Sequence, residues 1–114
     1  EAWSELPMFS GLRSRGESWL QRDRERRSTH CPDRLAQALE GLGLGQQEDL
    51  LERLHELPMP ALFVAGGGDA VYVEHALRMA SAAPLGMPVF LPRVGHAVVG
   101  EAPRALARVI QMGI

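Results

Sequence analysis

The sequence lacks the features that mark several large classes of protein. Cys31 is the only cysteine, so no internal disulfide can form and a reducing compartment is compatible. No apolar run approaches the roughly 18 residues that a membrane-spanning helix needs, and no signal-peptide pattern is visible. The formal net charge is −2, which offers no basic surplus for nucleic acid or an anionic membrane. We therefore expect a cytoplasmic protein with neither nucleic acid nor a membrane as its partner.

What the sequence does contain is ordinary for a globular protein. Apolar residues make up 46% and charged residues 23% of the 114 positions, enough for one small hydrophobic core. The one dense basic run, residues 22–27, is interrupted by Asp23 and Glu25, which favours a solvated helix face over a phosphate-binding stripe. The chain starts at Glu1 and not at a methionine, which is compatible with a processed product or a fragment.

Residues 1–57 have the pattern of helices joined by loops. Glu17–Ser28 is polar and rich in arginine, and Pro32 opens a second helix whose leucines recur at i, i+4 and i+7. Residues 46–57 predict a third helix. The leucines that this third helix should turn inward are Leu50, Leu51, Leu54 and Leu57. The apolar residues that could form a short lid near the start of the chain are Trp3, Leu6, Met8 and Phe9.

Residues 58–114 alternate between strand and helix patterns. The continuous apolar run at 61–65 stops at three glycines, as a buried parallel strand does. Helical spacing follows over residues 73–83, a second apolar run covers 87–91, and Pro103 suits the first turn of another helix. This order predicts a right-handed βαβ unit followed by a helix. Because two parallel strands do not make a stable sheet, we expect exposed strand edges and a tendency to associate.

Two residues with catalytic chemistry follow the two predicted strands. Asp69 comes directly after the glycines that end the first strand, and His96 follows the second strand after Val94 and Gly95. Open α/β sheets bind ligands at the carboxyl ends of their strands, and neighbouring strands lie about 4.8 Å apart. An aspartate there can fix the tautomer of an imidazole and stabilise its cation. Each residue alone also fits turn chemistry, but the combination favours a catalytic pair.

The other reactive side chains lack a recognisable pattern. His30 and Cys31 are adjacent, with no second ligand pair at the spacing of a zinc site, so we expect no metal site. His55 and His75 fall on predicted helices and should lie at the surface. The glycines at 66–68 are not followed by the Gly-Lys-Ser/Thr of a phosphate-binding loop.

Two segments resemble the catalytic loops of α/β-hydrolases. MPALFVAGGGD, ending at Asp69, is similar to the strand and loop that carry the triad acid, and LPRVGHAVVGEAP, with His96, to the loop that carries the histidine. The chain order in that fold is serine, acid, histidine, but no Gly-x-Ser-x-Gly elbow is present here. The resemblance implies the α/β fold class and the C-terminal part of an α/β-hydrolase. A helical cap segment (residues 1–57) would precede a β-α-β-α part of the parallel sheet (residues 58–114).

The cap pattern narrows the resemblance to the 2-succinyl-6-hydroxy-2,4-cyclohexadiene-1-carboxylate synthases of the menaquinone pathway. WSELPMF supplies a Trp-x-x-x-Pro-x-Phe segment, followed by an arginine, a Gly-x-Gly-x-Gln stretch and a leucine-rich segment. Ser4 departs from the pattern, in which a tyrosine often follows the tryptophan. The positions that match are Trp3, Pro7, Phe9, Arg27, Gly43, Gly45 and Gln47 (or Gln46).

That family eliminates pyruvate from a cyclohexene carboxylate that carries a succinyl side chain, without a metal or an organic cofactor. The resemblance implies that His96, paired with Asp69, activates a serine that this chain does not contain, so the chain alone would be inactive. It implies that Arg27 grips a substrate carboxylate; alternatively, Arg27 is one more solvated charge. Trp3 would wall the substrate pocket or pack the cap onto the core.

Two other functions remain open at this point. The parent protein could be an esterase or another hydrolase on the same fold, because the acid and the histidine cannot distinguish the two reactions. The chain could also be a non-catalytic fragment or an interaction module. The expected partners are a small-molecule carboxylate substrate and the N-terminal half of the same fold.

Overall fold

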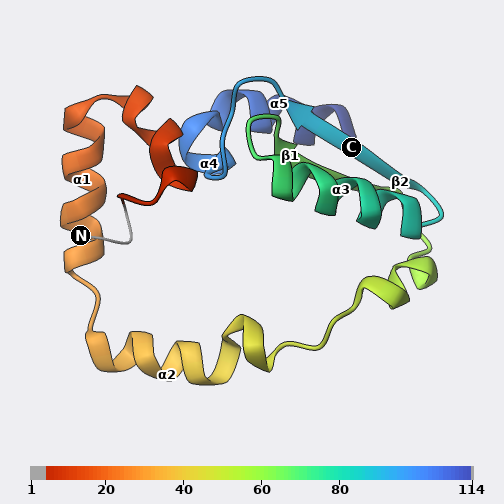
Figure 1. Cartoon of the computed structure of the whole chain (residues 1–114), viewed down its shortest axis with the longest axis horizontal. Helices are drawn as coiled ribbons and strands as arrows, with labels where there is room; N and C mark the ends of the chain where they lie inside the picture. Colours follow the sequence, from red (N-terminus) through yellow and green to blue (C-terminus); the bar gives the residue numbers. More distant parts are fainter. Residues whose placement is uncertain (1–4, 114) are drawn as a thin grey trace.

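The computed structural model describes residues 5–113 (Figure 1), so Trp3 and Ser4 lie outside the described residues. The helices and strands are, in chain order, the 3₁₀ helix η2 (Pro7–Arg15), α1 (Glu17–Ser28), α2 (Pro32–Leu42), the 3₁₀ helices η3 (Leu44–Gln46) and η4 (Leu51–Glu56), β1 (Ala61–Gly66), α3 (Ala70–Ala82), β2 (Gly86–Leu91), α4 (Val98–Glu101) and α5 (Pro103–Gly113).

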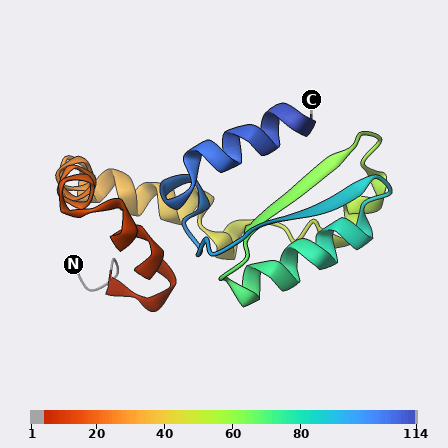
Figure 2. The ribbon, with the colours of Figure 1, turned by 90° about the horizontal axis from the view of Figure 1, so that it is seen from above.

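The two strands form a parallel pair, and α3 connects them. The register runs from Ala61 opposite Gly86 to Gly66 opposite Leu91, so both strands end at the same edge of the sheet. Helix α3 packs against one face of the pair, and α5 lies on the other side (Figure 2). The predicted order strand–helix–strand–helix is therefore confirmed, as are both strands to within a residue.

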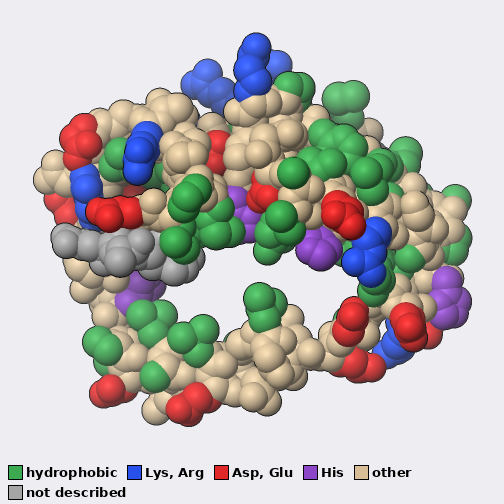
Figure 3. All heavy atoms as spheres, viewed as in Figure 1, with side chains coloured by type: hydrophobic (Ala, Val, Ile, Leu, Met, Phe, Trp, Pro, Cys, Tyr) green, Lys and Arg blue, Asp and Glu red, His purple; other side chains and the backbone are tan. Residues whose placement is uncertain are grey.

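The hydrophobic core is small and sits between α3 and the strands, while Leu12 of η2 is buried beside Gly100 of α4. Among the described residues, the buried apolar side chains are Leu12, Ala65, Ala76, Ala80, Ala83 and Leu91. Four of these six are alanines, which bury little area, and burial stabilises by only about 25 cal/mol per Å² of apolar surface. Larger apolar side chains remain exposed over much of the surface that Figure 3 shows.

Helix α2 stands apart from the sheet. It follows α1 in an arc that returns to β1 through η3 and η4 (Figure 1), and Figure 3 shows an open space between this arc and the sheet. The predicted leucine stripe is present on α2, but no residue of the helix is buried. Leu39 and Leu42 are 70% and 74% exposed. The apolar face of α2 thus has no cover within the described residues.

The prediction of a third α-helix over residues 46–57 is wrong. The structure has only the short 3₁₀ helix η4 there, and Leu50 is exposed instead of facing inward. The physical reason lies at Asp49, whose Oδ1 accepts a hydrogen bond from the N–H of Leu51 at 3.0 Å. A local side-chain acceptor of this kind competes with helical hydrogen bonding.

Two further differences affect the elements around the sheet edge. Helix α3 begins at Ala70, three residues before the predicted start, because Asp69 caps it. The one-turn helix α4 precedes α5 and has no counterpart in the prediction.

His55 and His75 are exposed, as expected. Among residues 5–113, no helix is both long and apolar enough to cross a bilayer.

Candidate active site

Glycines bring the loops that carry Asp69 and His96 together at the carboxyl edge of the sheet. The N–H of Gly67 donates to the carbonyl oxygen of Leu91, and the N–H of Gly68 to that of Val94, both at 2.8 Å. These bonds continue the strand pairing beyond the strands. A Cβ atom on Gly66 would overlap the carbonyl oxygen of Gly95. The glycine run therefore allows backbone contacts that any larger residue at position 66 would prevent.

The carboxylate of Asp69 binds in two directions. Its Oδ1 accepts a hydrogen bond from the backbone N–H of Tyr72 at 3.3 Å, which caps α3. Its Oδ2 lies 2.8 Å from Nδ1 of His96. The side chains of Asp69 and His96 are only 13% and 22% exposed. The expectation that the two loop tips are neighbours, with the carboxylate on the imidazole, is confirmed.

The imidazole of His96 is held between two aromatic rings. The Tyr72 ring meets it edge to face with centroids 4.5 Å apart, and the Phe9 ring does so at 5.7 Å. With Nδ1–H donating to Asp69, Nε2 is the ring nitrogen that can accept a proton. One wall of this arrangement comes from α3 and the other from η2.

A tight turn and the carboxylate of Glu101 hold the loop that carries His96. Pro92 and Arg93 occupy the turn, which the N–H of Val94 closes on the carbonyl of Leu91 at 3.3 Å, and Arg93 has a φ of +59°. Farther along, the carboxylate of Glu101 accepts hydrogen bonds from backbone N–H groups of the His96 loop. The loop is therefore held by hydrogen bonds on both sides of the histidine.

Arg27 lies in the last turn of α1, where it binds Asp23. Nε of Arg27 donates to Oδ2 of Asp23 at 2.7 Å, and Nη2 of Arg26 donates to Oδ1 at 2.6 Å. Burial raises the pKa of Asp23, but the two arginines outweigh this effect and hold the pKa below its usual value of 3.8. The ion pairs orient the Arg27 guanidinium on the surface of α1.

A groove of about 930 Å³ runs between η2 and α1. Arg27 and Asp23 line it together with apolar side chains that include Phe9 and Leu20. Phe9 also contacts His96, so the groove wall adjoins the Asp69–His96 pair. The structure thus places Arg27 on the wall of a groove whose lining also includes Phe9, which contacts His96. Trp3 lies outside the described residues.

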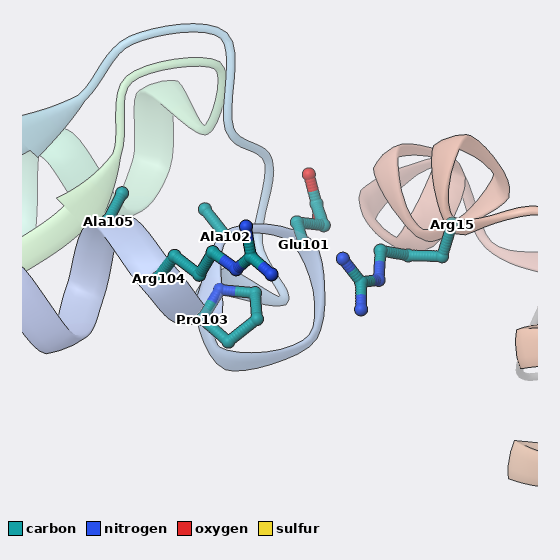
Figure 4. A pocket seen from close by; sticks show the side chains of 6 residues that line it. All are labelled: Arg15, Glu101, Ala102, Pro103, Arg104 and Ala105. Carbon is teal, nitrogen blue, oxygen red and sulfur yellow. The ribbon is translucent and has the colours of Figure 1, made fainter.

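A second, smaller hollow of about 340 Å³ lies behind the His96 loop. Its walls come from Arg15, from Glu101 and from the first residues of α5. Figure 4 shows the Arg15 side chain extending from η2 toward the α4–α5 corner. Across residues 5–113, no cluster of three histidine, cysteine or acidic side chains could hold a metal ion.

Three contacts of the site were not predicted from the sequence. The contact of Tyr72 with Asp69 and His96 had a signal, because an aspartate at a helix N-cap binds the N–H two or three residues later. The sequence places Phe9 in a possible lid and in the cap pattern, but neither pattern predicts its contact with His96. Nothing in the spacing of Glu101 predicts its bonds to the His96 loop.

Comparisons with known proteins place this chain within a longer fold. No protein-family model matches it. Over 108 residues, 95% of the chain, it is 28% identical to a protein of Bacillus subtilis (strain 168) named "Putative 2-succinyl-6-hydroxy-2,4-cyclohexadiene-1-carboxylate synthase". It also matches the structure of MenH from S. aureus with a TM-score of 0.90 and 28% identity, over 97% of the chain.

The matched regions are 39% and 42% of those two proteins, so the chain spans about two fifths of the length of the relatives it matches. The resemblance indicated by the cap and loop motifs is confirmed. The chain has the fold of the C-terminal part of an α/β-hydrolase.

Proposed function

We propose that this chain supplies the cap and the acid–histidine pair of a lyase that eliminates pyruvate from a succinyl-cyclohexene carboxylate. The observation that carries the proposal is the 2.8 Å contact between His96 Nδ1 and Asp69 Oδ2 at the carboxyl edge of the sheet. Similarity along nearly the whole chain to a protein named as a 2-succinyl-6-hydroxy-2,4-cyclohexadiene-1-carboxylate synthase supports the choice of reaction.

The proposed role of His96 is to move a proton. Nε2 takes the proton of a serine hydroxyl, and the serine oxygen removes a proton from a ring carbon of the substrate. The electrons of the broken C–H bond form a ring double bond while the C–O bond to the leaving group breaks. The leaving group departs as the enolate of pyruvate and takes the proton from the His96 imidazolium, which gives pyruvate and restores the neutral imidazole. Asp69 holds the productive tautomer and stabilises the imidazolium during the step.

The proposed role of Arg27 is to bind a substrate carboxylate. A guanidinium binds a carboxylate through parallel hydrogen bonds, and the bond from Arg27 Nε to Asp23 keeps its plane oriented at the groove. Phe9 connects this groove to His96. A substrate with several carboxylates would therefore extend from the cap to the catalytic pair. Trp3 is proposed as a further wall of the same pocket.

The nucleophile serine and the oxyanion donors are proposed to lie in the remaining part of the fold. The relatives are more than twice as long as the matched region. The two-stranded sheet and the exposed leucines of α2 are the surfaces on which such a part would pack. Without that part, the chain is inactive by this proposal, and the assembled enzyme is cytoplasmic.

The test is to complete the fold and assay two reactions. The part of S. aureus MenH that this chain does not match would be fused ahead of residues 1–114, and both the fusion and the chain alone would be assayed. We expect the fusion to release pyruvate from the lyase substrate and the chain alone to release none. His96→Ala and Asp69→Asn should each lower kcat by about 10³–10⁴-fold.

The alternatives give different results in the same assays. Cleavage of p-nitrophenyl esters without pyruvate release would show an esterase and contradict the lyase proposal. Turnover by the isolated chain would contradict the requirement for a second part. Full activity of the His96→Ala fusion would contradict the proposed role of His96 in proton transfer.

A further inference from the structure

We propose that Glu101 is a positioning residue that holds the His96 loop and thereby sets the imidazole against Asp69. Oε2 of Glu101 accepts a hydrogen bond from the N–H of Gly95 at 2.7 Å, and Oε1 accepts one from the N–H of Ala97 at 3.2 Å. A single carboxylate thus binds the residues immediately before and after His96. The inference rests on the proposed function of His96.

The two hydrogen bonds to the Glu101 carboxylate hold the loop that precedes α4. Gly95 and Ala97 both precede α4, which is only four residues long. The N–H of Glu101 returns a hydrogen bond to the carbonyl of Ala97 at 2.8 Å, and the N–H of Val98 binds the carbonyl of His96 at 3.0 Å. Backbone and side chain of Glu101 therefore close a small ring that contains the histidine.

Two glycines leave room for the carboxylate. A Cβ atom on Gly95 would lie 2.9 Å from Oε1 of Glu101, and a Cβ atom on Gly11 would overlap Oε2. Gly11 belongs to η2, so the cap segment lies directly on the acid that holds the catalytic loop. Arg15, from the end of the same 3₁₀ helix, extends toward this corner as well (Figure 4).

The negative charge is the specific requirement. A carboxylate only accepts hydrogen bonds, and it can serve two N–H groups at once with charge-assisted bonds. A glutamine of the same size has one acceptor oxygen and one NH₂ group, so one of the two loop N–H groups would face a donor. Glu101→Gln therefore weakens the clamp with little change in volume.

The test uses NMR on the 114-residue chain with three variants. Glu101→Gln removes the charge, Gly11→Ala displaces the carboxylate from the cap side, and Glu40→Gln on exposed α2 is the matched control. In the wild type and the control, the amide protons of Gly95 and Ala97 should give downfield, hydrogen-bonded signals. The His96 Nδ1 proton should give a hydrogen-bonded, downfield signal.

In Glu101→Gln and Gly11→Ala, we expect the downfield His96 signal to broaden or disappear while the amide signals of β1 and β2 keep their dispersion. Glu101→Gln should also move the amide proton signal of at least one of Gly95 and Ala97 upfield, because one of the two hydrogen bonds is lost. An unchanged His96 signal in both variants would overturn the proposal. Loss of the β1 and β2 dispersion in Glu101→Gln would overturn it too, because the residue would then support the fold and not the histidine.

The activity of the fused enzyme adds a separate readout. Glu101→Gln should lower kcat by about 10²-fold with KM nearly unchanged, because a misplaced general base affects the chemical step more than binding. An unchanged kcat in an active fusion would refute the positioning role. If the unsubstituted fusion releases no pyruvate, the proposed function fails, whereas the NMR result still decides whether Glu101 holds His96.

Discussion

The backbone N–H of Tyr72 donates to Oδ1 of Asp69 at 3.3 Å, while the other oxygen of the same carboxylate binds His96. One side chain thus begins helix α3 and orients the imidazole. The two tasks use different oxygens, so substitutions can separate them.

Asp69→Asn should keep the hydrogen bond at the N-terminus of α3 and lose the orientation of the His96 imidazole. Asparagine caps a helix about as well as aspartate, but its NH₂ group would face Nδ1 of His96 and disfavour the productive tautomer. We expect the free energy of unfolding to stay within about 0.5 kcal/mol for Asp69→Asn and to fall by about 1 kcal/mol for Asp69→Ala. Urea unfolding measures both; equal losses in the two variants would contradict the capping role.

Gly66→Ala should separate the two loops, because its Cβ atom would overlap the carbonyl oxygen of Gly95. We expect a loss of about 1–3 kcal/mol in the free energy of unfolding, the usual cost of overpacking. Gly41→Ala is the control, since a Cβ atom at this position in α2 meets nothing within 4 Å. That variant should gain helix content, because alanine is favoured over glycine in helices by about 0.5–1 kcal/mol. A stable Gly66→Ala would show that the loops can move apart at little cost.

The Asp23 ion pairs should make α1 sensitive to acid. Burial opposes the charged form of Asp23, but Arg26 and Arg27 hold the pKa of the folded state below 3.8. A depressed pKa contributes stability above the unfolded-state value, and this contribution is lost as the pH falls through the folded-state value. Stability should therefore fall below about pH 3.8 more steeply in the wild type than in Asp23→Asn. Thermal unfolding between about pH 2 and 6 measures the difference; parallel curves would rule out this linkage.

The isolated chain should self-associate through its uncovered apolar surfaces. Leu39 and Leu42 of α2 and Phe90 of β2 are exposed, and a strand edge with free backbone groups favours pairing with another chain. Sedimentation should show a mass that rises with protein concentration. Leu39→Glu should reduce this rise with little effect on stability, because Leu39 is 70% exposed. A monomer at every concentration would contradict the prediction.

The sheet edge was the part of the site that sequence reasoning could predict. Two apolar runs separated by a helical pattern predict parallel strands, and parallel strands end at one edge, which places Asp69 beside His96. The helix over residues 46–57 was wrong because periodic leucines did not reveal the bond from Leu51 N–H to the Asp49 side chain. The bonds of Glu101 and the approach of Gly11 depend on how the chain turns at α4, which no local pattern specifies.

The alanines buried beneath α3 have a consequence for how the site is built. A helix that meets a sheet through methyl groups lies closer to it than one that meets it through leucines. Asp69 stands at the first residue before this helix, so its reach toward β2 is set by the smallest side chains in the core. The distance between Asp69 and His96 would then depend on small side chains in the core. Enlarging Ala76 or Ala80 would push α3 away from the sheet and move Asp69 relative to His96.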